Sequence, residues 1–331
     1  NTNGKVVRYS LQMKIAAIFS LIIAVLGIVL VWFNYSENKK VALFAADDVF
    51  SRVTRNSSAN LQSLYTPAEA LVDLTTKLEW VDHENYSGRQ ALLKYFSEAL
   101  ILAKHISNIY IGYADGEFYL LQAVRGSDQV RQRFNAPPAT EWIVNSIENN
   151  NAGVSKQIFY FHDANLNVLG ASDAKVAQYD PRQRRWYSLA IEADEQITSG
   201  FYEFFETGEI GTTIAQRTSA GHAVVGADLT LEEINISLTE ERITESTQLL
   251  LINAEGIVIA QDNAPVGLQR TLEKAQSPFM HLKDLDSPVF KALHEQYLAS
   301  SKSGQLRFVV DSQTWLGSIT QLPVRSGAVV Y

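Results

Sequence analysis

The longest run of hydrophobic residues lies near the N-terminus. Between Ile15 and Phe33 the only polar side chain is Ser20. A helix rises about 1.5 Å per residue, so this run nearly crosses the hydrocarbon core of a bilayer, which is about 30 Å thick. It predicts a transmembrane helix over residues 15–34, with residues 1–14 on the cytoplasmic side because they contain basic but no acidic residues. A cleaved signal peptide is the alternative, but the run is longer than the hydrophobic region of such a peptide.

Hydrophobic residues keep a helical spacing after this run. The stretch from Val41 to Leu64 has the spacing of one long helix. The pair Thr66-Pro67 predicts a new helix start, because a residue before proline avoids the helical conformation. We therefore expect a long stalk helix and a helical lead-in over residues 35–105, with a break near Tyr65 and a last helix from Gly88 to His105.

The spacing then changes to that of strands. Two runs, residues 108–114 and 117–124, flank Asp115-Gly116, which is a strong signal for a two-residue hairpin turn. Three later runs are separated by short turns and predict an antiparallel meander. Before the meander we expect a short helix at Thr140–Ile147 and another that begins at Pro181. Further strands are expected at residues 157–162, 200–206, 210–218 and 222–228.

Residues 246–331 predict a shorter series of strands and helices in a similar order. The chain is therefore expected to have an α+β fold, in which a long N-terminal helix precedes two antiparallel sheet domains. These domains are expected at residues 106–245 and 246–331. We expect the second to stop before its last strand and before a second transmembrane helix. Its predicted elements are a hairpin at 248–253 and 257–261, an amphipathic helix at 287–298, a hairpin at 305–310 and 313–320, and the opening of a strand at 326–331.

Composition narrows the possible partners and compartments. The 331 residues are 46% hydrophobic, which is enough for two cores. The 28 basic and 36 acidic residues give a net charge of -8, and no basic patch with interleaved aromatic residues is visible, so nucleic acid is not an expected partner. The absence of cysteine excludes disulfides and thiolate zinc sites. An extracytoplasmic domain of this kind would depend on its hydrophobic cores alone.

The stretch from Tyr179 to Tyr187 holds the densest recognition chemistry in the chain. Asp180 can cap a helix that starts at Pro181. In that helix Arg184 and Tyr187 would be three residues apart and would lie on one side. A guanidinium group beside aromatic rings suits a small carboxylate or another planar polar ligand. In the alternative interpretation, the aromatic residues belong to the core and the arginines are solvated.

The sequence contains no recognisable set of catalytic residues. Its six histidines are scattered, with no pair at the spacing of a metal site. It also lacks a glycine-rich phosphate loop and a Gly-x-Ser-x-Gly elbow. Adjacent acids such as Glu232-Glu233 would diverge by about 100° on a helix, which favours a solvated face. We expect no catalytic residue, no metal site and no cofactor in this chain, and a membrane-anchored enzyme is the least favoured hypothesis.

The order of a transmembrane helix, a long helix and two antiparallel units resembles bacterial double Cache sensor modules over residues 35–331. Residues Asp180 to Tyr187 are similar to the Asp-Pro-Arg-x-Arg-x-Trp-Tyr signature of the membrane-distal unit. Residues Gly226 to Leu229 are similar to the Gly-x-Asp-hydrophobic strand that ends this unit. The chain looks closest to modules joined to cyclase-type or HD-GYP phosphodiesterase-type enzymes. Three stretches carry this closer likeness: Tyr110–Gly116, Phe201–Thr213 and Val225–Leu231.

The resemblance implies two PAS-like sheet domains and a ligand pocket in the membrane-distal one. In amino-acid-sensing members, the Arg-x-Trp-Tyr residues hold the ligand carboxylate and two aspartates hold its amine. This implies Asp228 as one aspartate, but Leu189 stands where the other is found. One opposite charge holds a cation weakly in a partly solvated pocket. A carboxylate, a hydroxylated or amide ligand, or no small ligand therefore remain open. The pocket candidates are Arg184, Trp186, Tyr187, Tyr202 and Asp228, with Tyr110 and Tyr119 as outer candidates.

These observations favour one function and leave alternatives. The favoured hypothesis is a sensor module in the periplasm, anchored in a bacterial inner membrane by Ile15 to Phe33, that binds a carboxylate-bearing or polar small molecule. We expect a homodimer with the long helix at its interface, and a cytoplasmic output outside this sequence. The chain itself would not be an enzyme. The alternatives are a module that binds a periplasmic protein partner, or the sensor of a histidine kinase or chemoreceptor.

Overall fold

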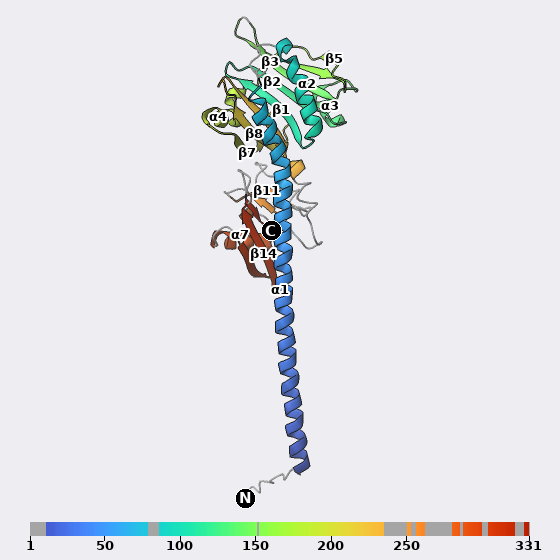
Figure 1. The fold of residues 1–331 in the computed structure, drawn as a ribbon, viewed down its shortest axis with the longest axis vertical. Helices are drawn as coiled ribbons and strands as arrows, with labels where there is room; N and C mark the ends of the chain where they lie inside the picture. The colour runs from blue at the N-terminus through green and yellow to red at the C-terminus, as the bar shows by residue number, and fades with distance from the viewer. Residues whose placement is uncertain are drawn as a thin grey trace. The chain divides into compact units, whose positions relative to one another are not determined.

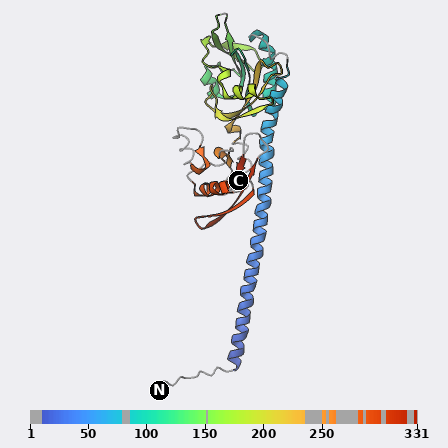
Figure 2. The same cartoon turned by 90° about the vertical axis from the view of Figure 1, so that its left-hand side faces the viewer.

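A computed structural model describes residues 11–78, 86–150, 152–234, 250–252, 256–261, 280–284, 287–299, 304–321 and 328–330. Its ribbon is drawn in two views (Figure 1, Figure 2). The chain divides into two compact units, residues 1–52 and residues 53–331. Both antiparallel sheets belong to the second unit.

Helix α1 (Leu11–Thr75) contains the long hydrophobic run. Among the described residues, it is the one helix that is long and apolar enough to cross a membrane. Its most apolar window has a mean hydropathy of 2.9, and none of that window is buried inside the protein. The predicted apolar helix near the N-terminus is therefore present, with its hydrophobic side chains left exposed.

The predicted break in the stalk helix is wrong. Helix α1 continues through Tyr65 and Pro67 and ends at Thr75. Proline inside a helix costs about 3 kcal/mol. The turns around it bury Leu64 and Val72, among others, and each large apolar side chain contributes about 1.5–3 kcal/mol on burial. Packing of this part of the helix therefore outweighs the local signal for a break.

The larger sheet has nine antiparallel strands in the order β5-β4-β3-β2-β1-β9-β8-β7, with β6 paired to β4. Helix α2 (Tyr86–Leu102) packs on one face, where the rings of Phe96 and Tyr119 lie 6.3 Å apart between centroids. Helix α4 (Arg185–Glu192) packs on the opposite face. A short helix α3 (Asp128–Phe134) and a 3-10 turn η2 (Pro181–Gln183) complete this part. The strands are β1 (Ile106–Tyr113), β2 (Phe118–Ala123), β3 (Trp142–Asn149), β4 (Ser155–His162), β5 (Val168–Ala171), β6 (Lys175–Val176), β7 (Ile197–Glu203), β8 (Ile210–Arg217) and β9 (Ala223–Thr230).

The predicted hairpin and meander of this sheet are confirmed, but one predicted helix is wrong. Strands β1 and β2 pair across Asp115-Gly116, and Gly116 has the positive φ of 91° that such a turn needs. Strands β7, β8 and β9 form the meander. Residues Thr140–Ile147 were expected to be helical, yet they form most of β3. This strand is buried on both faces along most of its length, so its sequence lacks the alternation of hydrophobic and polar residues that marks a half-buried strand.

The smaller sheet has six strands in the order β12-β11-β10-β15-β14-β13. Its core contains Leu250, Ile252, Phe290 and Phe308, among other side chains. The predicted hairpins and amphipathic helix are present, and residues 328–330 form a strand between β10 and β14. The elements are β10 (Leu250–Ile252), β11 (Ile257–Gln261), β12 (Met280–His281), η3 (Leu282–Asp284), α7 (Pro288–Ala299), β13 (Gly304–Val310), β14 (Gln313–Gln321) and β15 (Ala328–Val330).

The two sheets repeat one arrangement of strands. In the larger sheet the order β2-β1-β9-β8-β7 places the last strand beside the first. In the smaller sheet the order β11-β10-β15-β14-β13 does the same. This common order agrees with the prediction of two successive antiparallel units. The larger sheet has β3, β4, β5 and β6 in addition, and these strands widen the face on which the candidate site lies.

Candidate functional site

The floor of the candidate site is one face of the nine-stranded sheet. Side chains at alternate positions of a strand share a face. On β1 these include Asn108 and Tyr110, and pairing places Tyr110 opposite Leu120 of β2, which lies opposite Asn145 of β3. On the other side of β1, Asn108 pairs with Asp228 of β9. These residues line a cavity that encloses about 540 Å³ of space, including the part open to solvent.

The wall opposite this floor comes from the motif around α4 and from the turn between β7 and β8. The cavity is aromatic in the middle and carries a few charged groups, as small-molecule sites commonly do. The motif contributes Tyr179, Arg184 and Trp186, and the end of β7 with the turn contributes Tyr202, Phe204, Phe205, Glu206 and Thr207.

The motif folds as two short helices instead of the single capped helix that was predicted. Asp180 accepts a hydrogen bond from the backbone N–H of Arg182 at 3.0 Å, so it does cap a helix start. That start is the 3-10 turn η2, which ends at Gln183 and is followed by Arg184, where the backbone is extended (φ -92°, ψ 143°). Helix α4 then begins at Arg185. Because Arg184 is extended and lies outside α4, its side chain and that of Tyr187 do not lie on one side of a single helix, as the sequence predicted. Arg184 lines the cavity and Tyr187 does not.

Arg184 lies over two aromatic rings that contact each other, with 5.3 Å between the centroids of Tyr179 and Phe205. Its guanidinium carbon is 5.3 Å from the centroid of the Phe205 ring and 5.7 Å from that of Tyr179. Contacts of this kind hold a guanidinium group in place while its N–H groups stay available. Among the described residues, no carboxylate forms an ion pair with Arg184. A planar anion in the cavity would therefore meet a positioned and uncompensated cation.

Asp228 is the buried acid of the site. Its Oδ1 accepts hydrogen bonds from the hydroxyl groups of Tyr110 and Thr213, both at 2.6 Å. Its Oδ2 accepts one from Asn108 Nδ2 at 3.3 Å, and Tyr202 extends the network through a 2.6 Å contact with Thr213. Burial raises the pKa of Asp228 to about 6, although these hydrogen bonds act in the opposite direction. Burial also raises the pKa of Tyr110 and Tyr202, so both phenols stay protonated.

A second acid, Glu206, lines the same cavity. Its Oε1 accepts hydrogen bonds from Asn145 Nδ2 at 3.2 Å and from Gln157 Nε2 at 3.0 Å. Burial raises its pKa, against the lowering effect of these two amides. Sequence reasoning did not identify this residue, because it lies in a turn where periodicity carries no information. The stretch Phe201–Thr213 that contains it was noted for its family likeness alone.

The structure brings together most of the predicted site residues. Tyr110, Arg184, Trp186, Tyr202 and Asp228 all line the cavity.

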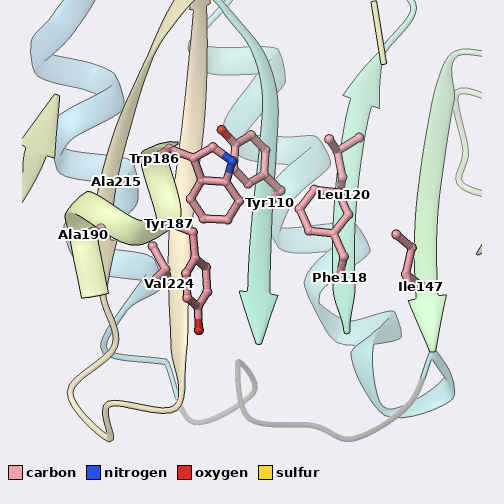
Figure 3. Close-up of a cluster of buried hydrophobic side chains, with 9 residues drawn as sticks. All are labelled: Tyr110, Phe118, Leu120, Ile147, Trp186, Tyr187, Ala190, Ala215 and Val224. Carbon is pink, nitrogen blue, oxygen red and sulfur yellow. The ribbon is translucent and has the colours of Figure 1, made fainter. Parts of the chain in front are cut away.

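The other two predicted residues lie elsewhere. Tyr187 packs beside Trp186, with 5.6 Å between ring centroids, in the aromatic cluster below the cavity, and its hydroxyl points away from Tyr110 (Figure 3). Tyr119 lies on the opposite face of the sheet, against α2. Neither residue is among those that line the cavity.

Leu189 does not occupy the position that the resemblance implied for an amine-binding aspartate. Its side chain is 41% exposed and does not line the cavity. Leu189 therefore does not stand in the cavity in place of an acid. The two acids that line the cavity are Asp228 and Glu206.

No metal site is visible among the described residues. No group of three or more histidine, aspartate and glutamate side chains in that part of the chain is placed to hold a metal ion. The cavity is lined by one cation, two acids, several amides and phenols, and other aromatic side chains. Such a set can bind and orient a small polar molecule.

Comparisons with known proteins agree with this arrangement. No protein-family profile matches the chain. A curated protein named adenylate cyclase 1, from Rhizobium meliloti, is 27% identical over 252 residues, which cover 75% of this chain and 37% of that protein. The chain therefore spans little more than a third of the length of this relative.

Two solved structures share the fold. One is the ligand-binding domain of the Pseudomonas fluorescens chemoreceptor CtaA in complex with L-serine, with a TM-score of 0.51 and 16% identity over 86% of this chain and 95% of that one. The other is that of the Pseudomonas aeruginosa amino acid chemoreceptor PctB in complex with L-Arg, with a TM-score of 0.51 and 17% identity over 86% and 92% of the two chains. The chain thus has the fold of these two chemoreceptor ligand-binding domains, in agreement with the fold that the resemblance implied.

Proposed function

We propose that this chain is the sensor part of a membrane-anchored bacterial signalling protein and that it binds a small carboxylate compound in the cavity of the nine-stranded sheet. The observation that carries this proposal is Arg184. Its guanidinium group is positioned by Tyr179 and Phe205, lines the cavity and has no acidic partner among the described residues. A carboxylate can accept two parallel hydrogen bonds from such a group.

A second observation supports a ligand with hydrogen-bond donors. Asn108 Oδ1 is buried beside Asp228 and has no hydrogen-bond partner among the described residues. An unsatisfied buried acceptor costs about 1–3 kcal/mol. An N–H or O–H group of a bound molecule would remove this cost and would also face the Asp228 carboxylate. A small dipolar compound, such as an amino acid, has a carboxylate for Arg184 and an N–H donor for Asn108 and Asp228.

The proposed setting is a bacterial inner membrane. The apolar part of α1 would cross the bilayer, and the sheet domains, two PAS-like units, would lie in the periplasm as a homodimer. The likeness to a protein named adenylate cyclase supports a cyclase-type output, in preference to an HD-GYP phosphodiesterase. Binding would change that output only as far as the ligand prefers one of two arrangements of the protein.

Thermal unfolding of the full chain in detergent tests the proposed binding. A compound at 100 times its dissociation constant should stabilise the fold by about 2.7 kcal/mol, which raises the melting temperature by a few degrees. We expect amino acids or other carboxylates to give this shift. Arg184→Ala should abolish it and leave the unliganded fold intact. The neighbouring Arg185 is exposed and does not line the cavity, so Arg185→Ala should respond like the wild type.

Either of two results would overturn the proposal. If no carboxylate compound shifts a well-folded wild-type protein, or if Arg184→Ala responds like Arg185→Ala, the cavity is not a carboxylate site. Binding of a periplasmic protein partner would then become the favoured function.

A further inference from the structure

The cavity has more acidic than basic side chains. Its charged side chains are Arg184, Asp228 and Glu206, so it holds one cation and two acids. Among the described residues, no lysine, arginine or histidine forms an ion pair with either acid. A ligand carboxylate at Arg184 would neutralise the cation and leave both acids without a counter-charge. Two carboxylates in a partly buried site favour ligands that bring positive charge.

Glu206 is held in place but not satisfied. Its Oε1 accepts two amide hydrogen bonds, from Asn145 and Gln157. Among the described residues, Oε2 accepts none. Both amides lie on strands of the sheet, so they fix the carboxylate although Glu206 itself lies in a turn. An acid that is oriented by two neutral donors and still has a free oxygen is well suited to bind a cation.

The two acids lie at different ends of the cavity. The partners of Asp228 are on β1 and β8, whereas those of Glu206 are on β3 and β4. Strands β9 and β3 are separated by β1 and β2. Neighbouring strands are about 4.8 Å apart, so β9 and β3 are about 14 Å apart. The side chains that hold Glu206 therefore come from strands well away from the strand that carries Asp228, which favours a separate ligand group for each acid.

The surface between the two acids is apolar. Leu120 of β2 lies between Tyr110 and Asn145 in the register of the sheet. Phe118 lies on the same face of β2, two residues before Leu120, and also lines the cavity. The cavity therefore has polar ends and an apolar middle, which matches a molecule with polar groups at both ends of a short aliphatic chain.

We propose that Glu206 binds a second cationic group of the ligand, so that the sensor prefers basic amino acids or compounds with the same charge pattern. The carboxylate of the ligand lies at Arg184, its α-ammonium group near Asp228 and Asn108, and its side-chain cation at Glu206. This inference rests on the proposed function and names the ligand class of the same site.

The test compares pairs of compounds that match in size and differ in charge. The pairs are L-arginine with L-citrulline, and L-lysine with 6-hydroxy-L-norleucine. Dissociation constants are measured by calorimetry on the full chain in detergent. We expect the cationic member of each pair to bind roughly 10 to 100 times more tightly, because a charged hydrogen bond to a buried acid is formed only by that member.

Glu206→Gln should remove this preference. The glutamine keeps an oxygen for Asn145 and Gln157 but has no charge, so we expect the two members of each pair to bind within about threefold of each other. The matched control is Glu203→Gln, since Glu203 is exposed on β7 and does not line the cavity. That variant should keep the wild-type preference. Circular dichroism and the unliganded melting temperature establish that both variants are folded.

Each remaining outcome has one meaning. If neutral amino acids bind as tightly as basic ones, or if the preference persists in Glu206→Gln, this inference is wrong while the carboxylate site at Arg184 stands. If no carboxylate compound binds to the wild type, the proposed function and this inference both fail.

Discussion

Gly226→Val is expected to lower the free energy of unfolding by about 3 kcal/mol or more and to abolish ligand binding. Gly226 lies on β9 opposite Tyr110 of β1, and a Cβ atom at this position would be 2.3 Å from Cε2 of the tyrosine ring. The ring has little freedom to move, because its hydroxyl donates to Asp228 and the ring makes a T-shaped contact with Trp186, with 4.9 Å between centroids. Overpacking of a rigid core costs about 1–3 kcal/mol for small additions, and valine adds three carbons.

Urea unfolding of the variant and the wild type measures this loss. The matched control is Gly170→Val on β5, where no atom lies within 4 Å of an added Cβ. That control should change the stability by less than about 0.5 kcal/mol. If Gly226→Val is as stable as the control and still binds its ligand, the ring of Tyr110 moves freely and is not held in place by Asp228 and Trp186.

Asp228→Asn is expected to change the pH dependence of stability. Burial raises the pKa of Asp228 in the folded protein to about 6, above the ordinary value of 3.8. The folded state therefore binds the proton more tightly than the unfolded chain, and this residue's contribution to stability is greatest below pH 3.8 and is lost as the pH rises to 6. The loss amounts to about 3 kcal/mol. Asparagine does not titrate, so the variant lacks this loss.

The measurement is the difference in unfolding free energy between Asp228→Asn and the wild type from pH 4 to pH 7. We expect this difference to move in favour of the variant by about 2 kcal/mol across this range, because part of the full change lies below pH 4. Glu206 also has a raised pKa, but it titrates in both proteins and cancels in the difference. A difference that stays constant with pH would mean that burial does not raise the pKa of Asp228. The variant should also lose affinity for cationic ligands.

The sequence predicts the two sheets better than it predicts where single side chains point. Hairpin turns and short loops have local signals, so the hairpins and the meander could be placed, whereas β3 was expected to be a helix and β5, β6 and β12 were not predicted. Tyr110 and Tyr119 were both chosen as outer pocket candidates. The register of the β1–β2 hairpin pairs Tyr110 with Leu120 and Ile111 with Tyr119, so the two tyrosines face opposite sides of the sheet. That register depends on the turn geometry.

The positions of Arg184 and Glu206 depend on structure that has no clear local signal. Asp180-Pro181 predicts a helix start. It does not predict that the helix is a 3-10 turn that ends at Gln183, or that Arg184 is extended before α4 begins. Glu206 reaches the cavity only because Asn145 and Gln157, which lie far away in the sequence, hold it there. Long-range contacts of this kind are not visible in hydrophobic spacing.

The common strand order has a consequence for the way the protein folds. In the larger sheet the first strand pairs with the last, so Asn108 and Asp228 meet across 120 positions of sequence. Contacts this distant form late, because the chain must close a long loop before they contribute. During synthesis, β1 leaves the ribosome well before its partner β9 exists. Asp228 lies on that final strand, so the recognition site cannot exist in any partly folded intermediate in which β9 is not yet paired.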